Sequence, residues 1–197
     1  MTTPTGNTYD KYGSSNPITK ALMRGFFSAL DGLLGDAPPR RILEIGAGEG
    51  EVADVVRRRW PNATYTAGDL WDPHLLDQWR PRNLTGAALD ATHLPFPDDS
   101  FDLVLAIEVL EHVVDPPAVL AELARVCSGR GVVSVPREPL WRALNMMRGS
   151  YLAQLGNTPG HINHWGARGF EALVSDHLRV VEVRRPLPWT MVGIEVA

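Results

Sequence analysis

Hydrophobic positions along this chain follow two patterns. Behind Asn16 and Pro17, which favour the start of a helix, apolar residues recur at helical spacing through 18–33, and Gly35 ends the pattern. Elsewhere, short apolar runs bounded by turn residues predict buried strands. We expect these strands at 41–45, 63–68, 86–89, 101–107, 132–135, 179–183 and 191–196.

Helices are expected between most of these strands. They are predicted after Gly50, at 75–79, behind the helix cap Asp115 and at 170–174. Strands that alternate with helices form right-handed crossovers and a parallel sheet covered on both faces. The last two strands have no helix between them, which predicts an antiparallel hairpin at one edge. The pattern therefore predicts an α/β fold with a doubly wound, mostly parallel, seven-stranded sheet.

A length of 197 residues predicts a single domain over residues 1–197. Within it, residues 1–35 are expected to form an N-terminal arm and helix, and 129–131 a Gly-Arg-Gly turn into the fifth strand. Residues 137–165 are an insertion before the last helix. Apolar residues at helical spacing predict a helix there: Leu140, Leu144, Met147, Tyr151 and Leu155. That helix either packs on the domain or covers an acceptor as a lid, and both interpretations stay open.

Composition narrows the class of protein. The chain is 44% hydrophobic and carries a net charge of −4, which disfavours disorder and a general nucleic-acid partner. A single cysteine, Cys127, excludes an internal disulfide and is expected in the core. The N-terminus has no signal-peptide pattern, and the most apolar run, 103–107, is too short to span a membrane. We therefore expect a cytoplasmic protein.

Unusual residues stand where the predicted strands end. A glycine-rich turn spans 44–50, and Asp69, Asp90 and Glu108 each close a strand. In an open α/β sheet, ligands bind outside the carboxyl ends of the strands. Glycines let the backbone approach a ligand closely, and the next helix directs its first N–H groups to the same place. The four positions together predict a ligand site at this rim.

The spacing of the glycines bears on which nucleotide binds. Asp69 follows Gly46 by 23 residues, which suits an acid that accepts hydrogen bonds from ribose hydroxyls. A dinucleotide motif needs a third glycine where this chain has Glu51. Glu44, ahead of the turn, would repel a pyrophosphate but suits a ligand with an ammonium group. The residues therefore favour S-adenosylmethionine over NAD.

Three segments resemble the motifs of one enzyme family. Residues 43–50, Leu-Glu-Ile-Gly-Ala-Gly-Glu-Gly, look like the first motif of class I S-adenosylmethionine-dependent methyltransferases, which have a Rossmann-like sheet. Residues 90–102 and 108–113 are similar to later motifs of the type 11 branch, related to ubiquinone and menaquinone methyltransferases. Residues 127–131 lack the proline that this family usually has there. The resemblance covers roughly residues 40 to 136 with specific motifs.

The resemblance implies a place for the amino-acid part of the cofactor. The methionine moiety would be held by Glu44 and by the backbone of Gly46, Ala47 and Gly48, with Glu108 below it. S-adenosylhomocysteine would be the product left at the same site. No metal ion is implied.

The resemblance also implies contacts to the nucleoside part. Asp69 would bind the ribose hydroxyls and Leu70 would lie against the adenine. Asp90 and Ala91 would contact the adenine ring and its amino group. Tyr12, in the N-terminal arm, either closes over the cofactor or belongs to a plain surface segment.

Three histidines are candidates for chemistry. Methyl transfer is an in-line displacement in which positioning supplies much of the rate, and some acceptors also need a base. His112, His161 and His164 are the candidate bases, because an imidazole titrates near neutral pH. Packing or capping is the alternative for each. His161 and His164 could hold a metal ion, but their motif offers no third ligand, and we expect none.

The sequence thus predicts an enzyme that methylates a small molecule. The apolar, Met-containing stripe of 137–165 suits an apolar or aromatic acceptor, and Arg137, Arg142 and Arg148 either bind an anionic group or are solvated. A non-catalytic module that binds S-adenosylmethionine or S-adenosylhomocysteine is the first alternative, and an NAD-linked oxidoreductase is the second. Negative charge and the lack of an Asn-Pro-Pro-Tyr-like motif disfavour an RNA substrate.

Overall fold

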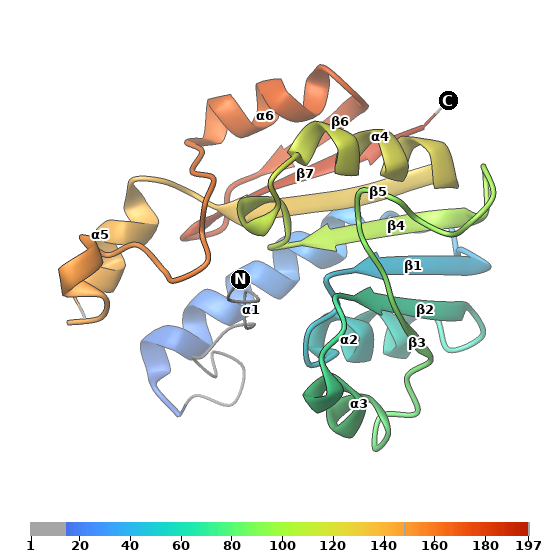
Figure 1. Ribbon diagram of the computed structural model, residues 1–197, viewed down its shortest axis with the longest axis horizontal. Coiled ribbons are helices and arrows are strands. Elements are labelled where there is room, and N and C mark those ends of the chain that lie inside the picture. Colours follow the sequence, from blue (N-terminus) through green and yellow to red (C-terminus); the bar gives the residue numbers. More distant parts are fainter. Residues whose placement is uncertain (1–14, 148, 197) are drawn as a thin grey trace.

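Seven strands form one sheet in the order β3–β2–β1–β4–β5–β7–β6 (Figure 1). The computed structural model describes residues 15–147 and 149–196. The strands are β1 (Arg41–Ile45), β2 (Thr64–Asp69), β3 (Gly86–Ala88), β4 (Phe101–Ile107), β5 (Cys127–Pro136), β6 (Arg179–Arg184) and β7 (Trp189–Glu195). The first five are mutually parallel, and β7 runs antiparallel between β5 and β6. The predicted parallel sheet with an antiparallel edge hairpin is confirmed.

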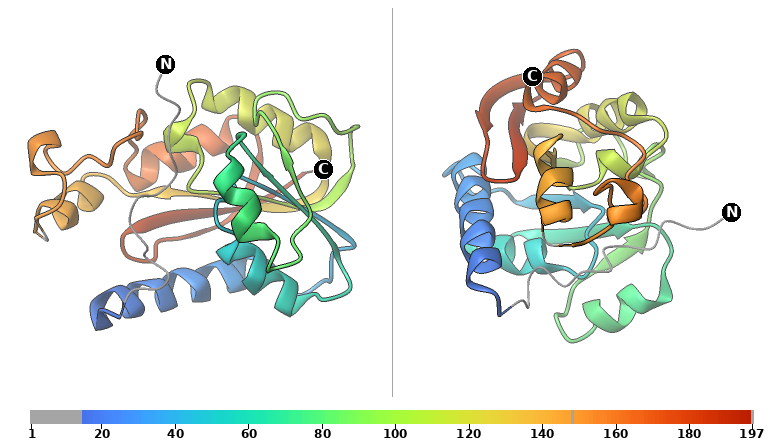
Figure 2. Two further views of the ribbon diagram at one scale, coloured as in Figure 1. Left: turned by 60° about the horizontal axis from the view of Figure 1, so that its bottom comes forward. Right: turned by 90° about the vertical axis from the view of Figure 1, so that its left-hand side faces the viewer.

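Helices cover both faces of the sheet, as Figure 2 shows. One layer holds α1 (Pro17–Leu33), α2 (Glu51–Arg59) and α3 (Pro73–Trp79), and the other holds α4 (Pro116–Val126) and α6 (Ala167–Ser175). Phe26 and Leu30 of α1 pack into one core with Leu103 of β4. Leu120 of α4 and Phe170 of α6 pack into the other. Because both faces are buried, the central strands are apolar throughout.

Helix caps follow the sequence closely. Asn16 accepts the N–H of Ile18 at 2.8 Å to start α1, and Asp115 accepts the N–H of Ala118 at 3.1 Å to start α4. The apolar stripe of α1 is buried from Met23 onward. Its first turn extends beyond the core, and Ile18, expected on the buried face, is 69% exposed.

The expected turn at 129–131 is wrong. These residues lie inside β5, which is continuous from Cys127 and pairs with β4 and β7. The glycines allow close approach between strands: a Cβ at Gly129 would lie 2.5 Å from the carbonyl oxygen of Asp102, and one at Gly131 would lie 2.7 Å from Val104. Cys127 is buried as expected, but it begins this strand and is not part of the helix face.

Residues 137–165 form a lobe at the carboxyl end of β5. It contains α5 (Leu140–Met147) and the short helix η2 (Leu152–Gln154), and it projects from the body of the molecule (Figure 1). Across the described ranges, no helix has both the length and the apolar composition needed to cross a bilayer. The lobe and the strand ends together surround the rim that the sequence marks as the ligand site.

Candidate cofactor and acceptor site

The glycine loop after β1 turns tightly and leaves one side open. Gly46, Gly48 and Gly50 have φ values of +66°, +50° and +88°, a region that favours glycine. A Cβ at Gly46 would meet Val109 at 2.3 Å, so the loop packs against the end of β4. Among the described residues, none has an atom within 4 Å of a Cβ built at Gly48. Ligand atoms can therefore approach the backbone at Gly48.

Asp69, the last residue of β2, holds this loop in place. Its carboxylate accepts the N–H of Gly48 at 2.7 Å and its own neighbour's N–H, from Leu70, at 2.7 Å. Trp79 of α3 donates its indole N–H to the carbonyl oxygen of Gly48 at 2.8 Å. Burial raises the pKa of Asp69 although both N–H groups favour its charged form. The sequence predicted the acid but missed the tryptophan.

An apolar surface continues from Asp69. Leu70 is 51% exposed and Trp71 is 68% exposed, directly after the strand. Large apolar side chains left in water beside a polar anchor are typical of a ligand-binding surface. Leu70 was a predicted cofactor residue, whereas Trp71 was missed, although its place after Asp69 could have indicated it.

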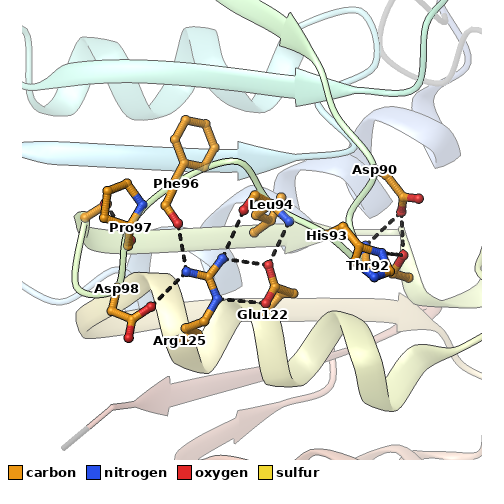
Figure 3. A network of polar contacts seen from close by, with 10 residues as sticks. Asp90, Thr92, His93, Leu94, Phe96, Pro97, Asp98, Glu122 and Arg125 are labelled. Atoms are coloured by element: carbon orange, nitrogen blue, oxygen red, sulfur yellow. Dashed lines mark hydrogen bonds and ion pairs between the residues drawn. The ribbon is translucent and has the colours of Figure 1, made fainter.

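Asp90 and Ala91 lie on the loop that follows β3. The carboxylate of Asp90 accepts the N–H of Thr92 at 2.9 Å and its hydroxyl at 2.7 Å (Figure 3). These bonds lower the pKa of Asp90, which is exposed. Ala91 is half-buried against the core below α4. The bonds fix the turn and keep the acid charged at the rim.

Arg125 of α4 fastens the rest of this loop. Its guanidinium donates to the carbonyl oxygens of Phe96 at 2.7 Å and Leu94 at 3.0 Å and to the carboxylate of Asp98 at 2.9 Å (Figure 3). Glu122 accepts from the same guanidinium and from the N–H of Leu94, and these contacts lower its pKa to about 2. These bonds attach residues 94–98 to α4. They thereby position the preceding segment, which contains Asp90 and Ala91.

Glu44 is buried in β1 and engaged by a tyrosine. The hydroxyl of Tyr65, on β2, donates to its carboxylate at 2.7 Å. Burial raises the pKa of Glu44 to about 8, the Tyr65 hydroxyl opposes this rise, and the charge of Asp69 adds to it. Burial therefore favours the protonated form of this acid more than water would. The sequence predicted Glu44 as a site residue but did not predict its partner.

Glu108 has a strained backbone at the end of β4. Its φ is +58°, which is costly for a residue with a Cβ, and strain of this kind recurs at functional sites. Its N–H donates to the carbonyl oxygen of Ser134 at 3.0 Å, and its carboxylate accepts the indole N–H of Trp189 at 2.5 Å. The predicted Glu108 therefore joins the ends of β4, β5 and β7.

A row of aromatic rings extends from Trp189 into the lobe. The ring of Trp189 lies 4.9 Å from Phe26 and 5.8 Å from Trp141 of α5. Trp141 stacks on His161 at 6.2 Å with an interplanar angle of 27°, and His161 meets His112 edge-on at 4.8 Å. Sequence reasoning found the two histidines but missed both tryptophans, because their approach depends on chain segments far apart.

Backbone bonds fix the lobe to the short helix η1 (Leu110–His112). The carbonyl oxygen of Glu111 accepts the N–H groups of Ile162 at 2.9 Å and Asn163 at 3.1 Å, and the Asn163 amide donates to the Val113 carbonyl at 2.6 Å. His112 bonds through Nδ1 to the carbonyl oxygen of Gly160 at 3.0 Å. Since a carbonyl only accepts, that nitrogen carries the proton, and Nε2 is the basic nitrogen of the neutral ring.

The three histidines have different surroundings. His161 is buried between Trp141 and His112, whereas His164 is exposed and bonds through Nε2 to the Asn157 side chain at 2.7 Å. Partial burial and the charge of Arg142 lower the pKa of His164. His161 and His164 therefore do not share the metal-pair arrangement that the sequence made conceivable.

A different set of metal-type ligands does come together. Single ligand atoms of Glu111, His112 and His161 all lie within 4.8 Å of one another. A carboxylate and two imidazoles are donors that zinc accepts. The sequence missed Glu111 as a member of this cluster because only the fold brings residue 161 to it.

The rim as a whole fits S-adenosylmethionine. Backbone open at Gly48 suits an amino-acid part, the Asp69 carboxylate can accept from ribose hydroxyls, and the exposed Leu70 offers an apolar face for adenine. Among the other predicted residues, Gly46 and Ala47 form the loop, and Ala47 donates its N–H to the Gly68 carbonyl at 3.0 Å. Tyr12, also predicted to contact the cofactor, lies outside the described residues.

Comparisons with known proteins find methyltransferases among the relatives of this chain. Residues 43–135 match the model of a family described as "Methyltransferase domain". A malonyl-[acyl-carrier protein] O-methyltransferase of Halorhodospira halophila is 39% identical over 103 residues, 48% of this chain and 34% of that protein. A demethylmenaquinone methyltransferase of Mycobacterium sp. (strain KMS) is 37% identical over 121 residues, 60% of this chain and 51% of that protein. The chain thus spans between a third and about half of these relatives.

A solved structure shares the fold. Magnesium protoporphyrin IX methyltransferase from Synechocystis, solved with bound S-adenosylhomocysteine, superposes with a TM-score of 0.68 over 94% of this chain and 90% of its own. The two sequences are 14% identical, so the likeness concerns the fold. It is the same Rossmann-like sheet with helices on both faces that the sequence predicted.

Proposed function

Because residues 43–135 match a methyltransferase-domain model and the sheet has the fold of such enzymes, we propose that the chain is a class I S-adenosylmethionine-dependent methyltransferase of the type 11 branch, which methylates a small-molecule acceptor at the rim of its sheet. The observation that carries this proposal is the backbone at Gly48, held by Asp69 at the carboxyl rim of the sheet, where Glu108 also bonds to Trp189 of the aromatic row. When bound, S-adenosylmethionine supplies an electrophilic methyl group on a positively charged sulfur. The residues of the chain supply the rest.

The strand ends would hold the cofactor. The loop amides at Gly46–Gly48 and the buried acid Glu44 would serve the methionine part, with Glu108 below it. Asp69 would accept from the ribose, and Leu70, Asp90 and Ala91 would surround the adenine, with Trp71 as a further apolar contact. An ammonium group above the loop would favour the charged form of Glu44, because an opposite charge lowers the pKa of an acid.

The aromatic row would bind and orient the acceptor. Trp141, which is half-buried, offers a large, rigid face on which an apolar or aromatic acceptor can stack, and the buried Trp189 supports it from the core. Positioning of this kind accounts for much of the rate of a displacement reaction. We place the lobe 137–165 as a wall of the acceptor site, because its bonds to η1 hold it in one position.

His161 is the candidate base. It is buried beside Trp141 and His112, and its ring can accept a proton from a hydroxyl or an acidic carbon as that atom attacks the methyl group. His112, fixed by the Gly160 carbonyl, would position it. The ring of His164 bonds instead to the Asn157 side chain, and it would contact the acceptor only if the lobe rearranged. We place this chemistry in the cytoplasm, where buried Cys127 would stay reduced.

Formation of S-adenosylhomocysteine tests the proposal. The purified chain is incubated with S-adenosylmethionine and, separately, with a quinol, a hydroxylated aromatic acid, a free fatty acid and an acyl thioester, and S-adenosylhomocysteine is quantified. The names of the two relatives motivate the quinol and the thioester. We expect product above the acceptor-free control with at least one class. Tight cofactor binding with no product from any class would favour the non-catalytic binding module.

A further inference from the structure

The lobe 137–165 is built with polar groups inside and apolar groups outside. Asn145, on α5, is 2% exposed and donates to the Gly156 carbonyl at 2.8 Å and to the Thr158 hydroxyl at 3.2 Å. Trp141 donates to the same hydroxyl at 2.9 Å. On the same helix, Met147 is 83% exposed. A helix that buries an asparagine and exposes a methionine is not packed as a soluble helix usually is.

Exposed apolar side chains concentrate at the end of this lobe. Within the described ranges, eleven large hydrophobic side chains are exposed, and five of them lie among the 29 residues of the lobe. Four of the five lie at the end of α5, in η2 or directly after η2, and we call them the apolar tip: Met146, Met147, Leu152 and Leu155. The tip stands away from the sheet (Figures 1 and 2). Clustered apolar groups left in water mark an interaction surface.

The charge of the lobe is opposite to that of the rest of the chain. The lobe contains three arginines and one glutamate, a net +2, while the whole chain carries −4, so the remainder carries −6. Arg142 pairs with Glu138 at 3.6 Å, which leaves the charges of Arg137 and Arg148 as the surplus. An anionic surface would therefore attract the lobe and repel the body of the protein.

We infer that the apolar tip docks on a lipid bilayer that contains anionic lipids, with its methionines and leucines in the interface and the net positive charge of the lobe attracted by the headgroups. Apolar side chains flanked by basic residues bind such surfaces through burial of apolar area plus electrostatic attraction. No described helix can cross the bilayer, so the binding is peripheral. Because the lobe begins at the end of β5, docking holds the rim close to the bilayer surface.

Vesicle flotation tests the docking without any methyl transfer. The full chain is mixed with phosphatidylcholine vesicles or with vesicles that also contain phosphatidylglycerol, at low and high salt. We expect flotation with the anionic vesicles, weakened by salt. Leu155→Glu and Met147→Glu should each lower the partition constant at least about tenfold, since moving such a side chain out of water is worth that much or more. Val181→Glu, at an exposed position of the edge strand β6, should bind like wild type.

Three outcomes would overturn the inference. The chain could fail to float with anionic vesicles at low salt, or it could float equally well with Leu155→Glu. Alternatively, sedimentation could show a wild-type dimer that Leu155→Glu converts to a monomer, which would assign the tip to a second copy of the chain. Circular dichroism of each variant shows that it is folded. Cofactor binding is measured separately, so a failure of docking leaves the proposed methyl transfer unaffected.

Discussion

The carboxylate of Asp69 and the backbone N–H of Gly48 lie 2.7 Å apart, so the end of β2 holds the loop that follows β1. The same carboxylate accepts from Leu70, at the start of the exposed apolar surface. One side chain thereby organises both the loop for the methionine part and the platform proposed for the nucleoside. The first two predictions follow from this arrangement.

Asp69→Ala should weaken binding of S-adenosylhomocysteine by roughly ten- to a hundredfold, because charged hydrogen bonds to the ribose and the support of Gly48 are lost together. Isothermal titration measures the change. Asp77→Ala is the control, since Asp77 is exposed on α3 and pairs at 3.7 Å with Arg80. Equal affinity of a folded Asp69→Ala variant and wild type would remove Asp69 from the site.

Gly48→Ala should fold but bind the cofactor poorly. Its φ of +50° costs an alanine roughly 1 kcal/mol, and the added Cβ would meet no atom of the described residues and would enter the space proposed for the ligand. Gly25→Ala is the matched control, because Gly25 lies within α1 with nothing within 4 Å, and alanine there should be neutral or stabilising. The idea fails if both variants keep wild-type affinity.

Stability should fall as the pH rises from about 4.5 to about 8. The pKa of Glu44 is raised to about 8 in the folded chain, so the unfolded chain loses this proton first and folding is progressively disfavoured across that interval. The loss is at most about 1.4 kcal/mol per pH unit. Glu44→Gln keeps an oxygen that can accept from Tyr65 but does not titrate, and it should flatten the slope. Urea unfolding of wild type and Glu44→Gln at several pH values measures this effect. If the free energy of unfolding fell equally with pH in both proteins, groups other than Glu44 would be responsible.

His161→Gln should lower turnover at least about tenfold while leaving cofactor affinity within a factor of about two, if the ring acts as a base. His177→Gln serves as the control, because His177 is exposed between α6 and β6, at the opposite rim. Unchanged turnover would leave His161 as a packing partner of Trp141.

Local features of the sequence were sufficient to predict the sheet and the residues that lie at its carboxyl rim. Apolar runs gave all seven strands, and caps such as Asn16 and Asp115 gave helix starts, because their bonds reach only two or three residues along the chain. The glycine loop and the strand-end acids depend on the same short range. Their position in one sheet then follows from the parallel crossovers.

Features that depend on distant contacts escaped prediction. Gly129 and Gly131 resemble a turn in sequence, yet they lie in a strand because β4 packs too closely for a side chain. Arg125 binds a loop about 30 residues earlier, and Trp141 meets Trp189 only through the fold. The local sequence pattern indicates neither the loop that Arg125 binds nor the contact between Trp141 and Trp189. The attachment of residues 94–98 to α4 and the aromatic row were therefore found only in the structure.

Direct titration of the cofactor product tests the central claim most simply. S-adenosylhomocysteine and NAD are titrated into the purified chain by calorimetry, with Asp69→Ala alongside. We predict one site for S-adenosylhomocysteine, weakened in the variant, and no binding of NAD, because Glu51 stands where a dinucleotide loop needs glycine. Binding of NAD in preference, or no heat with S-adenosylhomocysteine, would contradict the account.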